Sequence, residues 1–102
     1  MKKNSAPKRK KVDFNEMSEM LKSTAHPSRI AIIELLCNCG CERMTVKNIY
    51  ERLNLEQAVA SKHLGILKRS NLLKRETEGS YTYFRLNSEN SVTTCIANCL
   101  KK

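Results

Sequence analysis

Long apolar runs are absent from this chain of 102 residues. No stretch reaches the roughly 18 consecutive apolar residues that span a bilayer. The N-terminus also lacks the apolar segment of a secretory signal peptide. We therefore expect a cytoplasmic protein with no membrane partner. The length allows one modest hydrophobic core, which predicts one folded domain.

The motifs of common enzyme classes are missing as well. There is no glycine-rich phosphate loop, no pair of carboxylates in an apolar setting, and no Cys–His pair at helical or hairpin spacing. The thiols Cys37, Cys39 and Cys41 are the one redox candidate, and their spacing is not the C-x-x-C of thioredoxin-like proteins. We therefore do not expect an enzyme.

Acidic side chains are scarce, because ten Asp and Glu oppose 19 Lys and Arg, a formal net charge of +9. Six basic residues precede the first acid, Asp13, and the remaining 13 give the rest of the chain a net charge of +3. We predict a disordered basic tail over residues 1–12 and a folded domain over residues 13–102. The tail suits either solubility or contact with a polyanion such as DNA.

The segment Val46–Ser70 has the pattern of a helix-turn-helix. Its first helix is expected to end near Asn54, because asparagine tolerates the left-handed conformation that such a turn needs. In the second helix, Ala60, Leu64 and Leu67 form one buried stripe. The opposite side is polar, partly basic and free of acids, and comprises Gln57, Ala58, Ser61, Lys62, Gly65, Lys68 and Arg69. Such a face is typical of a helix that reads DNA.

Two more helices are expected before this segment. The apolar spacing from Phe14 to Leu21 predicts the first. Pro27 suits the first turn of the second, which continues to Cys37 and is apolar nearly all round. A loop is expected over residues 38–43. The second helix therefore belongs in the middle of the protein.

A β-hairpin is expected directly after the helix-turn-helix. Residues 72–77 and 81–86 carry the β-branched and aromatic side chains of strands, and Gly79 and Ser80 lie in the turn between them. This hairpin would be a wing, with Arg75 and Arg85 beside its tip. Ser88 is expected to cap a last helix. The predicted fold is mainly α (α+β), a winged helix-turn-helix of five helices and one hairpin.

Three segments resemble the ArsR/SmtB family of bacterial winged-helix repressors. They are Leu21–Leu36, which contains His-Pro-x-Arg, Gln57–Leu73, the expected DNA-reading helix, and Glu78–Leu86, the expected wing. Their order and spacing match the family from about residue 13 to 102. The resemblance implies a homodimer, an inverted-repeat DNA operator in the bacterial nucleoid, and release by an inducer. It implies that the first and last helices form the dimer interface, through Phe14, Met17, Leu21, Val92, Cys95, Ile96 and Cys99.

The chain departs from the family at two places. Glu56 stands where many members have Ser or Thr before the recognition helix, and Glu is a poorer helix cap. Thr45 and Lys47 stand where the family often has the two cysteines of a metal site. We therefore expect no metal site in the first helix of the helix-turn-helix.

The residues expected to contact DNA lie on the recognition helix and the wing. Gln57 and Ser61 are placed to meet base edges, whereas Lys62, Lys68 and Arg69 suit phosphates. The run from residue 57 to 75 holds five Lys and Arg and no acid. His63 is expected to pack inside the protein. The full predicted set is Gln57, Ala58, Ser61, Lys62, Lys68, Arg69, Arg75, Gly79 and Ser80.

The five cysteines allow three interpretations. Their odd number, without a signal peptide, favours reduced thiols over a disulfide scaffold. In the simplest interpretation Cys95 and Cys99 are small buried side chains at a dimer interface, and the loop cysteines are incidental. A second interpretation is a thiolate site for Zn, Cd, Pb, Cu(I) or As(III), formed by Cys37, Cys39 and Cys41 and completed by Cys95 or Cys99. No other cofactor is indicated.

The third interpretation is a redox or persulfide switch between Cys37 and Cys95 or Cys99, although Glu34 occupies the position that the family usually gives to the first cysteine of such a switch.

Taken together, these features predict a homodimeric, sequence-specific transcriptional repressor that a soft metal or metalloid ion releases from its operator. The alternatives are the redox-sensing repressor and a winged-helix protein-interaction module with no inducer. The acid-free basic face over residues 57–75 favours DNA over the interaction module.

Overall fold

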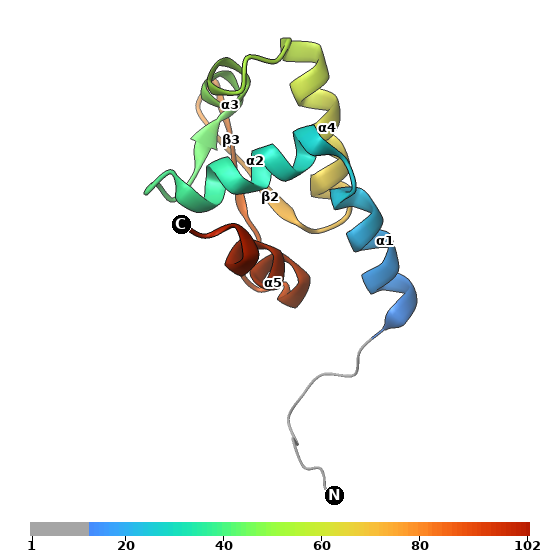
Figure 1. Cartoon of the computed structure of the whole chain (residues 1–102). Coiled ribbons are helices and arrows are strands. Elements are labelled where there is room, and N and C mark those ends of the chain that lie inside the picture. Colours follow the sequence, from blue (N-terminus) through green and yellow to red (C-terminus); the bar gives the residue numbers. More distant parts are fainter. Residues whose placement is uncertain (1–12) are drawn as a thin grey trace, which may run out of the picture.

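The computed structural model describes residues 13–102, which form five helices and a three-stranded antiparallel sheet (Figure 1). This confirms the predicted winged helix-turn-helix. The predicted disordered tail, residues 1–12, lies outside the described residues. Across residues 13–102, every helix is too short or too polar to cross a membrane.

The first two helices begin at side chains that cap them. Asp13 accepts hydrogen bonds from the backbone amides of Asn15 and Glu16 and starts α1, Phe14–Thr24. His26 Nδ1 accepts from the Ser28 amide at 3.1 Å and starts α2, Pro27–Asn38. Pro27 occupies the first turn of α2 as predicted, where its missing N–H has no partner to lose.

The helix-turn-helix consists of α3, Val46–Arg52, and α4, Gln57–Arg69. Asn54 lies between them at φ 55°, which confirms the predicted left-handed turn. Glu56 precedes α4 and its side chain makes no capping hydrogen bond, as its poor capping propensity predicts. Packing rather than a cap therefore holds the start of the recognition helix.

The hairpin comprises β2, Leu73–Glu78, and β3, Tyr81–Leu86, and its turn places Gly79 at φ 62°. A two-residue strand, β1, Met44–Thr45, pairs with β3 on the other side. Sequence patterns did not predict β1, because two residues carry no measurable alternation. Its pairing ties the segment before α3 to the wing.

The last helix, α5, runs over Ser91–Leu100 and begins later than predicted. The expected cap at Ser88 is wrong. Asn90 caps α5 instead, because its side chain accepts from the amides of Val92 and Thr93. Both Asn and Ser are good caps, so composition alone did not choose between two positions so close together.

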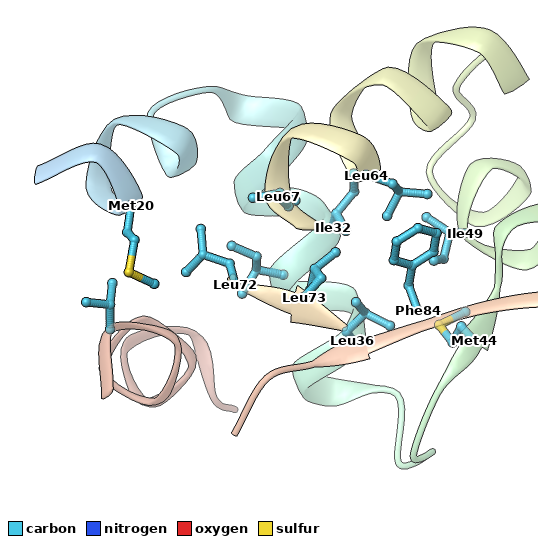
Figure 2. Close-up of a cluster of buried hydrophobic side chains, with 12 residues drawn as sticks. Met20, Ile32, Leu36, Met44, Ile49, Leu64, Leu67, Leu72, Leu73 and Phe84 are labelled. Carbon is cyan, nitrogen blue, oxygen red and sulfur yellow. The ribbon is translucent and has the colours of Figure 1, made fainter. Parts of the chain in front are cut away.

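The core is one cluster beneath α4, shown in Figure 2, and α2 supplies its centre through Ile32, Ile33 and Leu36. In that view Leu64 of α4 lies beside Ile49 of α3 and Phe84 of β3. At the other end, Met20 of α1 points toward α5. The same packing therefore fixes the recognition helix relative to the wing and to both terminal helices.

We expect Leu64→Ala to lower the free energy of unfolding by about 2–5 kcal/mol, because Leu64 is buried and its loss leaves a cavity beneath α4. Chemical denaturation measures this change. Val59→Ala is the control, since Val59 lies on the same helix but is exposed, and its effect should stay within about 0.5 kcal/mol. Equal losses in the two variants would contradict this account of the core.

Candidate DNA-binding surface

All nine residues predicted to contact DNA are exposed. They lie on α4 and at the hairpin, as predicted. On α4 they form two neighbouring strips, because Gln57, Ser61 and Lys68 recur at helical spacing beside a second strip of Ala58, Lys62 and Arg69. Their contact with DNA itself remains a prediction.

An open groove of about 510 Å³ separates the first strip from the wing. Gln57, Ser61 and Lys68 line its α4 side, and Arg75 and Ser80 line its wing side. The structure therefore brings together five of the nine predicted residues. The other four, Ala58, Lys62, Arg69 and Gly79, lie outside the groove lining.

Sequence reasoning missed four other residues of this groove. Thr45 and Lys47 line it from the start of α3, and Tyr81 and Thr82 line it from β3. Thr45 also caps α3, because its hydroxyl accepts from the Asn48 amide at 3.1 Å. Tyr81 had a usable signal, since it is a large aromatic residue directly after a predicted turn, and 61% of it is exposed.

The charges in this groove have one sign. Lys47, Lys68 and Arg75 come from α3, α4 and β2, and none of the described residues that line the groove is an acid. Cations on three separate elements around one open channel suit the spaced phosphates of a nucleic-acid backbone. The arrangement can therefore bind a polyanion.

Arg85 does not belong to this basic surface, although its sequence position suggested it. In the hairpin register Arg85 pairs with Lys74 and Arg75 pairs with Phe84. Arg85 and Arg75 therefore point to opposite faces of the sheet, since side chains alternate along a strand. The Arg85 Nε donates to Glu76 Oε2 at 2.5 Å, and this ion pair lowers the pKa of Glu76.

His63 packs inside the protein, which confirms its prediction, and only 7% of it is exposed. The Arg29 Nε donates to His63 Nδ1 at 3.1 Å, and Arg29 Nη1 donates to the Ser23 carbonyl at 3.1 Å. The His26 ring lies 4.5 Å from the His63 ring, between centroids. The His-Pro-x-Arg sequence thus begins α2 and also connects α2 to the inner side of α4.

The cysteines form one bond that was not predicted. Cys39 and Cys41 form a disulfide with each other, whereas reduced thiols were expected. Cys37 is free, and its Sγ donates to the Ala97 carbonyl of α5 at 3.4 Å. Cys95 and Cys99 are exposed and free, so the predicted pairing with Cys37 is not formed. Cys39 and Cys41 are only two residues apart, so the local turn of the loop brings their sulfurs together. Their spacing in the sequence did not reveal this bond.

The thiols do not form the predicted metal group in this structure. Within residues 13–102, no three Cys, His, Asp or Glu side chains are grouped to hold a metal ion. The disulfide uses two of the three loop sulfurs that a thiolate site needs. These residues therefore do not fit a soft metal ion as they stand.

The predicted dimer residues divide into three groups by exposure. Phe14 and Leu21 are 78% and 48% exposed, and Cys95 and Cys99 are exposed too. Val92 is buried in the core of its own chain, and its place at an interface stays a prediction. Met17 and Ile96 are partly buried against that core. Helix α5 packs against α2 and α1, and Val92 lies on the side that faces them.

The fold and this surface define a winged helix-turn-helix DNA-binding protein. The helix-turn-helix domain family matches residues 24–76. The arsenical resistance operon repressor of Bacillus subtilis is 34% identical over 76 residues, which cover 74% of this chain and 70% of that protein.

Two solved structures have the same fold. The transcriptional repressor PagR of Bacillus anthracis superposes with a TM-score of 0.74 at 30% identity, covering 86% of this chain and 95% of PagR. HlyU from Vibrio cholerae superposes with a TM-score of 0.74 at 26% identity, covering 84% of this chain and 89% of HlyU. The chain belongs to the ArsR/SmtB family of winged helix-turn-helix repressors. It is a DNA-binding transcriptional repressor and not an enzyme.

We expect the stability of the protein to fall as the pH drops below about 6.5, the ordinary pKa of histidine. Burial, and after it the charges of His26, Arg29 and Lys62, lower the pKa of His63 in the folded state. As the pH falls, His63 therefore binds a proton in the unfolded chain before it does so in the folded protein. The contribution of neutral His63 to stability is complete above pH 6.5 and is lost as the pH falls toward the folded-state pKa.

Urea denaturation at pH 7.5 and pH 5.0 measures this loss. His63→Asn keeps an acceptor for Arg29 but removes the titrating group, so the difference between the two pH values should shrink in this variant. An unchanged difference would show that His63 is not the responsible group.

Proposed function

We propose that this protein is a homodimeric repressor that places two α4 helices in successive major grooves of an inverted-repeat operator on the bacterial nucleoid, in the cytoplasm. The observation that carries the proposal is the acid-free groove between α4 and the wing, with its three cations. The centres of the two half-sites would lie about one helical turn apart, roughly 34–36 Å.

Gln57 and Ser61 would read base edges at the start of α4. Gln can pair with adenine through two hydrogen bonds, and Ser pairs with several bases. Lys47, Lys68 and Arg75 would bind phosphates, which position the protein without reading sequence. Both hydroxyl and amide side chains lie in the same groove as the cations, which supports this division of roles.

The exposed apolar side chains of α1 support the dimer. Phe14 and Leu21 lie seven residues apart on one side of α1, and both are largely exposed to solvent. Exposed large apolar side chains that gather on one helix mark an interaction surface. Helix α5 contacts α1 and carries exposed Cys95 and Cys99. A second copy of the chain would cover both helices.

The inducer would act through thiol–disulfide chemistry at Cys39 and Cys41. Hydrogen peroxide, which accepts two electrons and two protons, would join their thiols by one S–S bond and yield two water molecules. The pair lies directly before β1 and α3, so the crosslink changes the loop that enters the helix-turn-helix. The disulfide favours this chemistry over a soft metal ion, which would require both thiolates.

We expect Lys68→Gln and Arg75→Gln each to weaken binding to duplex DNA from the region upstream of the protein's own coding sequence. Each variant should lower the slope of log affinity against log salt by about one per protomer, because one phosphate contact is lost. Fluorescence anisotropy at 50–200 mM salt measures this, with two protomers expected per duplex.

Lys101→Gln is the matched control, since it removes the same charge at the far end of α5 and should leave the slope unchanged. A wild-type affinity for DNA that does not depend on salt would contradict the phosphate contacts. Failure of the wild-type protein to bind any local promoter would favour the protein-interaction module instead.

We expect oxidation with peroxide to lower operator affinity by about fivefold or more, the lower range of typical allosteric coupling. Cys39→Ser/Cys41→Ser should abolish this response, whereas Cys95→Ser/Cys99→Ser should retain it. Operator affinity of each protein before and after oxidation, with thiols counted in parallel, provides the measurement. A response that survives without Cys39 and Cys41 but requires Cys95 and Cys99 would place the switch on α5.

A further inference from the structure

The outer face of the wing, turned away from the groove, carries a compact group of charges. Arg43 Nη1 lies 3.0 Å from Glu76 Oε1, and Arg43 Nη2 contacts Glu78 Oε1. Arg85 binds the second oxygen of Glu76. Two cations therefore meet two acids, which leaves this group of four side chains with no net charge.

Arg43 is the member of this group that does not belong to the hairpin. It lies in the loop before β1, and its guanidinium carbon stands 3.8 Å from the centroid of the Tyr83 ring. A planar guanidinium can bind two carboxylates and cover an aromatic ring at once, which a lysine ammonium cannot. Arg43 therefore connects the loop to three side chains of the wing.

Glu76 and Glu78 both lie in β2, and β3 contains no acid. Glu78 is the last residue of β2 and pairs with Tyr81, so it stands beside the turn that lines the groove at Ser80 and Tyr81. An approaching phosphate backbone would meet this carboxylate at close range. Opposite charge beside Glu78 is therefore needed if the tip is to approach a polyanion.

We propose that Arg43 is a positioning residue for DNA binding, whose charge neutralises Glu78 so that the wing tip can approach the phosphate backbone. This inference rests on DNA binding through the groove between α4 and the wing. Arg43 itself lies on the outer side of the sheet with its acids, and it acts through the wing rather than by contact with DNA.

Four variants test this role in one binding assay, with wild type and variants in the same redox state. Arg43→Gln should weaken binding to the promoter duplex roughly three- to tenfold at 50 mM salt, because Glu78 is then unpaired. The difference in affinity between wild type and Arg43→Gln should become smaller at 200 mM salt, since screening weakens repulsion between exposed charges. If the substitution only misplaced the wing, the difference in affinity would be the same at both salt concentrations.

The double variant Arg43→Gln/Glu78→Gln should recover affinity to within about twofold of wild type, because it removes both members of the pair. Arg43→Lys should also stay near wild type, as it keeps the cation. Lys74→Gln is the matched control, because it removes the same charge from the outer face, but at the base of the hairpin, where Lys74 pairs with Glu89.

Thermal melts show first whether each variant folds. If Arg43→Gln does not fold, the comparison between Arg43→Lys and Arg43→Lys/Glu78→Gln takes its place, and the second should bind at least as tightly as the first. The proposal is overturned if Arg43→Gln binds DNA like wild type. It is also overturned if adding Glu78→Gln to the Arg43 variant restores no affinity for DNA. Absence of DNA binding by the wild-type protein would instead remove the function on which the proposal rests.

Discussion

The burial of one side of α4 is the constraint on which the rest of the structure depends. Ala60, Leu64 and Leu67 lie inside the core, against the buried side chains of α2. Each fully buried leucine contributes about 1.5–3 kcal/mol relative to an exposed one. No capping side chain fixes the start of the helix, so this packing sets which residues of α4 reach solvent. The polar face is exposed to solvent because the apolar face packs against the core.

The two faces of the hairpin separate two kinds of charge. Side chains alternate along a strand, so Arg75 faces the groove while Glu76 and Glu78 face the other way. The cation on the groove side is available to a polyanion, and the acids on the outer side are paired with Arg43 and Arg85. A hairpin with nearly balanced charges can thus present a basic side to DNA.

Local patterns predicted much of this structure. Helical spacing gave the buried side of α4, the turn at Asn54 and the inward position of His63, because each depends on residues close together in the chain. The contact of Arg29 with His63 spans 34 residues, and that of Arg43 with Glu76 spans 33. Periodicity shows which side of an element is apolar, but it does not show which distant residue will face a given side chain.

The central claim is that the groove between α4 and the wing binds DNA. An NMR titration of the protein with promoter duplex tests it most directly. Backbone amide signals of residues 45–47, 57–68 and 79–82 should shift together as DNA is added, while those of α5 should move little. The account is contradicted if the largest shifts lie on α5 or on the outer acids of the wing and the groove signals stay in place.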